Sequence, residues 1–323
     1  MQSIRFDLVV PTYNRSRLLK KTLESVREAR LPERMQLRVL VVDNNSRADE
    51  AQANARIVSE LGDPRFQLIV EPRQGSSHAR NAALAVADGD WIGFIDDDEE
   101  LTEGWFEAAW AHLSKPEVGF IGGPYLPNWE SKPPSWLPAA VGKYIAVIGW
   151  VELGDRVAEF GPGFDGMTMG GNIVVKREWF DRVGHYDTEL GRKAEGLHTG
   201  GDHDMHDRLM AAGARGFYVP ELAVRHFIPD SRLTKQYHRR WAFWHGLSDQ
   251  RLDLINPKPV TYLAGMPRYI LGKGARGAVR ALKARLPGSR EPAQAFSGEL
   301  EAIETLGWIA GRLKGRQAPS ARF

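Results

Sequence analysis

The stretch Trp91-Ile92-Gly93-Phe94-Ile95-Asp96-Asp97-Asp98 places five apolar or small residues directly before three aspartates. A short apolar run of this kind is typical of a strand buried on both faces of a parallel sheet. Adjacent carboxylates raise one another's pKa, and a divalent cation such as Mg²⁺ or Mn²⁺ relieves their repulsion. The stretch therefore predicts a strand that ends in a metal site. A solvated acidic turn that caps the helix after Thr102 is the alternative interpretation.

Similar apolar runs occur on both sides of this stretch, over the first 123 residues. The predicted strands are 6–10, 37–42, 66–70, 91–95 and 118–121, and the predicted helices are 17–29, 50–61, 77–87 and 103–113. Such an alternation predicts an α/β fold with a mostly parallel sheet that is flanked by helices on both faces. Ligands bind such sheets at the carboxyl ends of their strands.

Polar side chains follow four of the predicted strands and would gather at this edge. The four loops are 11–15, 43–46, 71–75 and 96–100. Asp43 can accept hydrogen bonds from a nucleobase, and Tyr13 offers an aromatic face to it. Arg73, Arg80 and Asn81 can contact phosphates, and the last two lie near a predicted helix start, which favours anions. We expect a polyanionic ligand with a metal ion here, although Arg80 in a surface ion pair is an alternative.

The pattern changes after residue 123. Residues 124–170 are rich in Pro, Gly and Trp, which indicates an irregular segment that can wall a substrate cleft, and the chain beyond 235 is mainly helical in pattern. We predict three parts: 1–123, which carries the ligand-binding edge of the sheet, 124–234, whose irregular segment can wall a cleft, and a helical extension at 235–323. Trp129, Trp136 and Trp150 of the irregular segment can stack on sugar rings, or they pack a small subdomain.

Several of these motifs resemble family-2 glycosyltransferases with the GT-A fold, in the same order along the chain. The matching runs are Val9-Val10-Pro11-Thr12-Tyr13-Asn14-Arg15, Val41-Val42-Asp43-Asn44-Asn45-Ser46, Ala79-Arg80-Asn81-Ala82, Phe94-Ile95-Asp96-Asp97-Asp98, Gly170-Gly171-Asn172 and Gly200-Gly201-Asp202. They extend from residue 6 to about residue 250. The resemblance implies a Rossmann-like sheet and an inverting enzyme that transfers a sugar from a nucleotide-diphosphate sugar with Mn²⁺ or Mg²⁺.

The resemblance also implies roles for single residues. Asp43 would recognise the base, usually uracil, so that a UDP-sugar is the expected donor. Asp96 would lie near the ribose and Asp98 on the metal, while Asp97 takes the variable middle position of this motif. The implied donor-binding residues are Pro11, Tyr13, Arg15, Asp43, Arg73, Arg80, Asn81, Asp96 and Asp97, and the implied metal ligands are Asp98 and His226. A lone histidine near a strand end, however, is usually structural.

The resemblance makes 1–123 the nucleotide-sugar-binding half and 124–234 the acceptor-binding half. The catalytic base is expected in the acceptor-binding half, at the start of a helix. Alignment on Arg208-Leu209 places Asp202 at the family's base position, and Gly201 stands where the family usually has a glutamate. Asp204 is the second candidate for the base, or it compensates the charge of the helix N-terminus. The sugar or lipid-linked acceptor would lie near Trp129, Trp136 and Asn172.

Two other functions remain open on the sequence. A sugar-nucleotidyltransferase also has an α/β sheet and an acidic metal site, but it usually begins with a Gly-rich basic loop, where this chain has Pro11-Thr12-Tyr13-Asn14-Arg15. A binding module that has lost activity is the other alternative, which the glycine at position 201 keeps open. Release of pyrophosphate would favour the former, and donor hydrolysis with Mn²⁺ would exclude the latter.

Composition and the C-terminal segment bear on location. The 323 residues carry a net charge of +2, which gives no reason to expect a nucleic-acid partner, and the absence of cysteine excludes thiolate nucleophiles. Neither a signal peptide nor an apolar stretch of membrane-spanning length is evident, so we expect a cytoplasmic protein. Residues 268–290 lack acidic side chains and combine basic with apolar positions, which indicates a contact with the membrane surface or packing on the catalytic domain.

Overall fold

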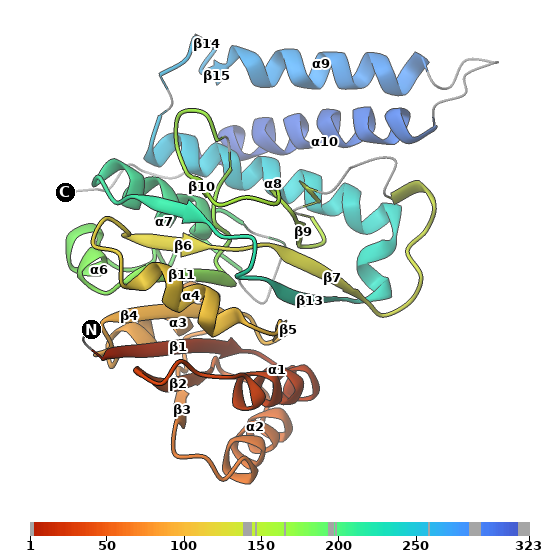
Figure 1. The fold of residues 1–323 in the computed structure, drawn as a ribbon. Helices are drawn as coiled ribbons and strands as arrows, with labels where there is room; N and C mark the ends of the chain where they lie inside the picture. Colours follow the sequence, from red (N-terminus) through yellow and green to blue (C-terminus); the bar gives the residue numbers. More distant parts are fainter. Residues whose placement is uncertain are drawn as a thin grey trace. The chain divides into compact units, whose positions relative to one another are not determined.

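The computed structural model describes residues 3–137, 144–145, 147–164, 166–192, 197, 199–257, 259–283 and 292–315. Two compact units make up the chain (Figure 1), and each is described by itself. Unit 1 comprises Met1–Asn128, Trp150–Ala194 and Gly201–Phe227, and unit 2 comprises Trp129–Gly149, Glu195–Gly200 and Ile228–Phe323. The predicted segment 124–234 is therefore divided between the two units.

Unit 1 is built on an eight-stranded sheet in the order β10-β12-β6-β11-β4-β1-β2-β3. The strands are β1 (Ile4–Thr12), β2 (Met35–Asp43), β3 (Phe66–Val70), β4 (Trp91–Ile95), β6 (Phe120–Gly122), β10 (Ala158–Glu159), β11 (Asn172–Lys176) and β12 (Gly216–Tyr218). Strands β4, β1, β2 and β3 run parallel, as predicted, whereas β11 runs antiparallel between β4 and β6. The carboxyl ends of β1, β2 and β4 thus meet at one edge.

Apolar side chains alternate between the two faces of this sheet and bury a helix layer on each. Val39 and Val41 of β2 face one core, and Leu40 and Val42 face the other. The first core also holds α1 (Ser16–Glu28), α2 (Ala48–Glu60) and α4 (Trp105–Leu113), and the second holds α3 (Ser76–Leu84), α6 (Glu178–Val183) and α7 (Gly201–Ala211). The predicted α/β architecture with helices on both faces is confirmed.

A second, smaller sheet follows the acidic loop and was not predicted. Within unit 1 it contains β5 (Glu99–Leu101), β13 (Val224–Ile228), β7 (Tyr125–Trp129) and β9 (Trp150–Val151) in that order. Its strands β5 and β13 pair antiparallel, with His226 opposite Glu99. This pairing brings the region around residue 226 back to the end of the aspartate loop.

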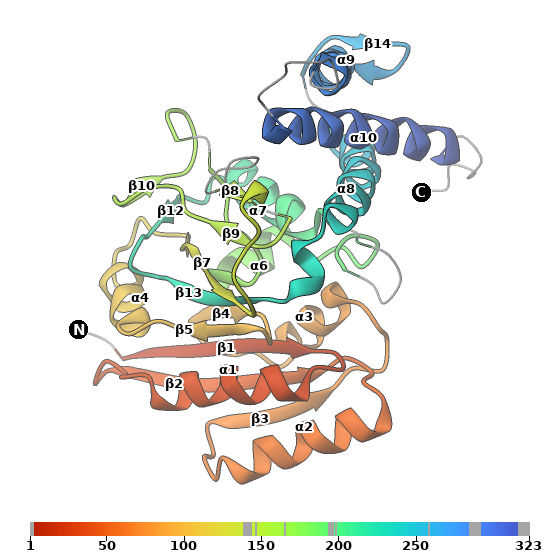
Figure 2. The ribbon, with the colours of Figure 1, turned by 90° about the vertical axis from the view of Figure 1, so that its right-hand side faces the viewer.

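Unit 2 is mainly helical, as predicted for the C-terminal part. It contains β8 (Tyr144–Ile145), the 3-10 helix η1 (Asp230–Leu233), α8 (Lys235–Ile255), the hairpin β14 (Tyr262–Leu263) and β15 (Met266–Pro267), α9 (Arg268–Lys283) and α10 (Pro292–Gly315). Helix α8 begins after Thr234, whose Oγ1 accepts the Tyr237 N–H at 3.1 Å. Helix α10 packs against both α8 and α9 (Figure 2). Among the helices described, none is long and apolar enough to cross a membrane.

Candidate active site

A cluster of carboxylates lies directly after β4, with Asp98 and Glu99 buried and Asp96 partly exposed. Single oxygen atoms of Asp96, Asp98 and Glu99 all lie within 4.8 Å of one another. The Oε2 of Glu99 accepts the Asp96 N–H at 2.9 Å, whereas its Oε1 is buried without a hydrogen-bond partner among the described residues. Burial, and then the charges of Asp96 and Asp98, raise the pKa of Glu99 well above its usual value. Hard oxygen ligands with an unsatisfied acceptor fit a divalent cation such as Mg²⁺ or Mn²⁺.

Arg15 lies on the β1 side of this cluster. Its Nη1 lies 3.1 Å from Asp97 Oδ1 and 2.8 Å from Asp98 Oδ2. Asp97 also accepts a hydrogen bond from Thr12 Oγ1 at 2.8 Å, and burial raises the pKa of its carboxyl while Arg15 opposes that shift. Asp97 therefore anchors the loop to β1, a structural role that the variable middle position of the motif did not suggest.

Arg80 links the aspartate loop to the predicted base. Its side chain is only 7% exposed, and its guanidinium reaches Asp96 Oδ1 at 3.3 Å and Asp202 Oδ1 at 3.0 Å. The guanidinium also lies over the ring of Tyr186, 5.3 Å from its centroid. Since helix α3 carries Arg80 and helix α7 carries Asp202, this one cation fixes the distance between two acids that are about a hundred residues apart in sequence. The surface ion pair considered as an alternative for Arg80 is excluded by its burial.

Two glycines let the backbone pass directly over these acids. A Cβ at Gly170 would lie 2.6 Å from Asp202 Cγ and 2.8 Å from Arg80 Nη1. A Cβ at Gly171 would lie 2.6 Å from Glu99 Oε1 and 2.8 Å from Asp96 Oδ2. All four distances are shorter than real Cβ contacts, so the Gly170-Gly171 pair is required by close approach to the acidic side chains.

His226 reaches the cluster from β13. Its side chain is 8% exposed, and its Nε2 lies 3.7 Å from Asp98 Oδ1. The ring of Tyr125 packs edge-on at 6.4 Å from the His226 ring. Burial, and then the negative charge of Glu99, raise the pKa of the Tyr125 hydroxyl well above its usual value. The two residues predicted as metal ligands, Asp98 and His226, are thus neighbours in space.

The loops after β1, β2 and β3 are joined to one another by side-chain hydrogen bonds. Asn14, at a positive φ of 54°, accepts the Arg47 N–H through Oδ1 at 2.8 Å, and its own N–H donates to Ser46 Oγ at 3.0 Å. Asn44 donates to the Arg73 carbonyl at 2.7 Å and accepts the Gly75 N–H at 2.7 Å. The three loops at the strand edge, where the ligand was expected, therefore hold one another in place.

Asp43, the predicted base-recognition residue, is part of this joined edge. It is 2% exposed, and it accepts the Ser46 N–H at 2.9 Å and the amide of Asn54 at 2.7 Å. A carboxylate has about four lone-pair sites, so these two bonds hold the side chain in place and leave acceptor capacity. Pro11 and Tyr13, at the end of β1, are half-buried.

Two residues expected to contact phosphates have other partners. Arg73 forms a bidentate pair with Glu71, at 2.9 and 2.8 Å, and this pair lowers the pKa of Glu71 to about 2. Asn81 uses both ends of its amide on the backbone of Tyr186, at 2.8 and 2.9 Å. These side chains stabilise the loop and the helix that carry them.

Asp204, the second candidate for the base, and Asn172, expected at the acceptor, also have partners within the protein. Asp204 forms a pair with Arg208, at 2.9 and 2.7 Å, which supports the interpretation that it is structural. Asn172, expected at the acceptor, is fully buried and bonds to Trp105 at 3.1 Å and to the Leu222 carbonyl at 2.6 Å. The structure places Asn172 in the core, because its amide satisfies backbone groups there.

The tryptophans predicted at the acceptor site fall in both units. In unit 2, Trp136 packs edge-on against His238 and Phe296, each with ring centroids 5.2 Å apart, which favours the packing interpretation. Trp129 is half-buried at the end of β7. Trp150, in unit 1, donates from Nε1 to Glu152 at 2.6 Å.

Glu99 is the site residue that the sequence interpretation missed. Glu99 and Leu101 lie on the same face of a short strand, and Leu101 is apolar. That alternation indicates a buried glutamate only once the segment is known to be a strand, and its composition is that of a loop.

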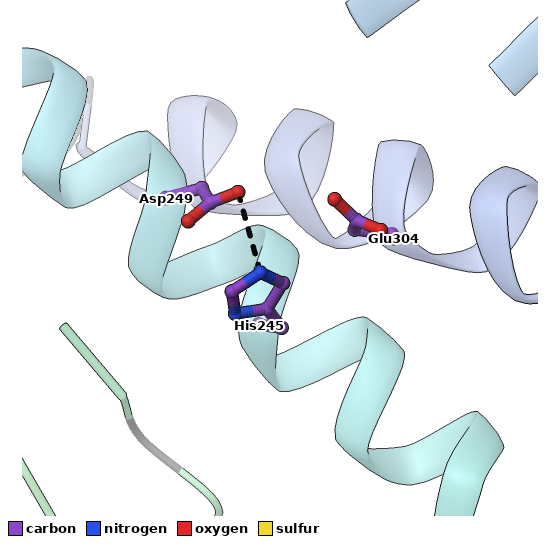
Figure 3. Close-up of side chains that lie close together, drawn as sticks. All are labelled: His245, Asp249 and Glu304. Carbon is purple, nitrogen blue, oxygen red and sulfur yellow. Dashed lines mark ion pairs between the residues drawn. The ribbon is translucent and has the colours of Figure 1, made fainter. Parts of the chain in front are cut away.

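A second group of metal-ligand side chains occurs in unit 2 (Figure 3). His245 of α8 lies 3.7 Å from Asp249, one turn further along, and Glu304 of α10 lies close to both. Lys273, however, donates to both carboxylate oxygens of Glu304, at 2.7 and 2.8 Å. Both oxygens of Glu304 are thus engaged by an ammonium group, whereas Arg15 and Arg80 each engage one oxygen of Asp98 and Asp96, so this second group is an ion-pair network between helices.

Comparison with known proteins agrees with the geometry of unit 1. The family model "Glycosyl transferase family 2" matches residues 7–184. The chain is similar to a glucosyl-dolichyl phosphate glucuronosyltransferase of Haloferax volcanii, with 27% identity over 263 residues that cover 79% of each chain.

Two solved structures have a similar fold. A mannosyltransferase of Pyrobaculum calidifontis, in complex with GDP-Man and Mn²⁺, has a TM-score of 0.60 and 19% identity over 98% of this chain and 88% of that one. The enzyme GalNAc-T7, with UDP, GalNAc and Mn²⁺, has a TM-score of 0.52 and 16% identity over 77% of this chain and 51% of that one. Since the family model covers more than half of the chain, this protein belongs to glycosyl transferase family 2 and is a glycosyltransferase with the GT-A fold.

Proposed function

We propose that the protein transfers a sugar from a nucleotide-diphosphate sugar, with uridine as the base, to a hydroxyl of a glycan or lipid-linked acceptor with inversion at the anomeric carbon. The observation that carries this proposal is the contact of Arg80 with both Asp96 and Asp202. It places a partly exposed carboxylate beside the acidic cluster but outside the group of proposed metal ligands. A general base for an incoming hydroxyl must occupy such a position.

The residues at the strand edge support the donor part of the proposal. Asp96, Asp98 and Glu99, with His226 next to Asp98, would hold Mg²⁺ or Mn²⁺, which supplies charge neutralisation for a diphosphate when bound. Asp43 is held with acceptor capacity for a base. The two solved structures were obtained with a nucleotide and Mn²⁺ in each case, and one of these nucleotides is a guanosine diphosphate sugar.

The proposed reaction is a single in-line displacement. The acceptor oxygen attacks the anomeric carbon, and the bond from that carbon to the diphosphate oxygen breaks, with its electron pair leaving on the diphosphate. Asp202, whose side chain is 31% exposed, takes the proton of the acceptor hydroxyl. Arg80 holds Asp202 Oδ1 at 3.0 Å and thereby orients the carboxylate. One displacement inverts the configuration of the sugar.

The acceptor class is proposed from the relatives. The Haloferax volcanii protein is named for a dolichyl phosphate substrate, and its alignment covers most of both chains. A hydroxyl on a lipid-linked sugar is therefore the first acceptor to test. The family assignment favours this transfer over the nucleotidyltransferase and the inactive binding module.

A thermal-shift panel tests the donor. UDP-, GDP-, dTDP- and CMP-sugars are compared with and without Mn²⁺, because a ligand that binds the folded state raises its stability in proportion to the logarithm of its concentration over Kd. We expect the largest increase in Tm with a UDP-sugar and Mn²⁺ together. A larger increase in Tm with a GDP-sugar would identify guanosine, in place of uridine, as the nucleoside of the donor. No increase with any of these sugars would contradict the proposal.

Two matched variants test the base. Asp202→Asn keeps the size and one acceptor oxygen of the side chain but loses the proton acceptor, so UDP release in the presence of acceptor should fall by about 10²–10⁴. Asp204→Asn, two residues further along α7, should retain activity because Asp204 pairs with Arg208. Both variants should still bind UDP with Mn²⁺ by calorimetry. Equal activity of the two variants would remove Asp202 from this role.

A further inference from the structure

Helix α9 has one buried and one exposed side within unit 2. Its buried side is made by Gly274 and Gly277, and a Cβ at Gly274 would lie 2.7 Å from Thr305 Cβ of α10. We call the exposed side the α9 outer face; it consists of Arg268, Tyr269, Arg276, Val279, Leu282 and Lys283. At 3.6 residues per turn these six positions fall within about 140° of the helix. Figure 1 shows that α9 lies on the side of α10 away from α8.

The α9 outer face carries positive charge that no described residue neutralises. Residues 268–283 include no aspartate or glutamate. Lys273 and Arg280 are paired with Glu304 and Glu301 of α10. Among the residues that the structure describes, Arg268, Arg276 and Lys283 make no ion pair. Three cations on one side of a helix need an anionic partner or water.

The same face exposes large apolar side chains. Tyr269, Val279 and Leu282 are 48%, 50% and 61% exposed, and Leu263 of the adjacent β14–β15 hairpin is 61% exposed. Of the large hydrophobic residues that are exposed in the described part of the chain, Tyr269, Val279 and Leu282 lie on one side of a single helix. Isolated exposed hydrophobics need no explanation, but a concentration of them marks an interaction surface.

We propose that the α9 outer face docks on the surface of a bilayer that contains anionic phospholipid. Cations mixed with exposed apolar side chains suit this partner, because the cations meet lipid phosphates while Tyr269, Val279 and Leu282 enter the boundary between headgroups and acyl chains. A nucleic acid would gain nothing from Val279 and Leu282. Docking does not rest on the proposed transfer reaction, since it is measured without donor or acceptor.

The test is flotation of the full-length protein with vesicles at low and high salt. Vesicles of phosphatidylcholine and phosphatidylglycerol in equal parts are compared with vesicles of phosphatidylcholine alone. The cation variant is Arg268→Gln with Arg276→Gln and Lys283→Gln. Its control is Lys20→Gln with Lys21→Gln and Arg56→Gln, which removes three exposed charges from α1 and α2 of unit 1. The apolar variant is Val279→Gln with Leu282→Gln.

Each cation beside an anionic surface contributes about a fivefold factor to partitioning, so the cation variant should bind the mixed vesicles about a hundredfold more weakly. The control should bind like the wild type, and the apolar variant should bind more weakly at both salt concentrations. Wild-type recovery should fall with phosphatidylcholine alone. Equal recovery of the wild type and the cation variant would overturn the proposal, as would tighter binding to duplex DNA than to mixed vesicles at the same salt concentration.

Discussion

Replacement of Gly170 by alanine tests whether the position of Asp202 controls the reaction. The new Cβ would lie 2.6 Å from Asp202 Cγ, and an ordinary contact begins at 3.4 Å. The new Cβ would lie closer still to Asp202 Oδ1, so Asp202 or the glycine backbone must move by at least about 0.8 Å, the difference between these distances. A misplacement of about 1 Å reduces catalysis by about 10²-fold. We expect kcat to fall by about that factor.

The accompanying loss of stability should be modest. Overpacking of a filled site costs about 1–3 kcal/mol, so the folded protein should persist with a lower Tm. Binding of UDP with Mn²⁺ should be retained, because the clash involves Asp202 and Arg80 and leaves Asp98 untouched. Kinetics of UDP release with saturating donor, together with calorimetry of UDP binding, separate the two effects.

The control is Gly272→Ala, at a helical glycine of α9. A Cβ there meets only the flexible end of Arg276, at 3.0 Å or more, so the alanine fits without displacing backbone. This variant should keep the wild-type kcat with a soluble acceptor. If Gly170→Ala also keeps the wild-type kcat, the position of Asp202 does not limit the reaction and the reasoning fails.

Three further changes have distinct expected outcomes. Gly171→Ala pushes a Cβ against Glu99 Oε1, so the affinity for Mn²⁺ with UDP should fall more than kcat does, as calorimetry would show; unchanged affinity would contradict the assignment of Glu99. Asp97→Asn weakens the contacts to Thr12 and Arg15 and should lower the free energy of unfolding by about 1–3 kcal/mol, measured by denaturant titration, and an unchanged midpoint would argue against its anchoring role. Burial lowers the pKa of His238 to about 4, so the unfolded chain binds the proton first as the pH falls. Stability should therefore be lost between pH about 6.5 and 4, by up to about 3 kcal/mol, and His238→Phe should reduce this dependence of Tm on pH.

The elements of the sheet could be predicted from the sequence because each has a strong local signal. Predicted strands 66–70 and 91–95 coincide with β3 and β4, since apolar β-formers fill four of the five positions in each. Strand β6 begins at Phe120, two residues later than predicted. Strand β5 was missed, because a three-residue strand that begins with two glutamates has the composition of a loop.

From the sequence, the loops that form the site could be predicted, but the partners of their side chains could not. The rule that parallel strands end at one edge correctly brought Asp96, Asp98 and Arg80 together. It could not say which partner each side chain takes, because that depends on contacts between distant parts of the chain. Asn81 and Asn172 therefore looked like ligand contacts, although each satisfies backbone groups from a segment far away in sequence.

The hydrogen bonds that join the loops after β1, β2 and β3 have a consequence for affinity. Asn14 and Asn44 fix these loops to one another through hydrogen bonds within the protein. A ligand that binds between them does not need to immobilise the loops, so little conformational entropy is lost there on association. Substituting Asn44 by alanine would release the loops, so that their conformational entropy would be lost when the ligand binds. The ligand would then bind more weakly, even without any contact to Asn44.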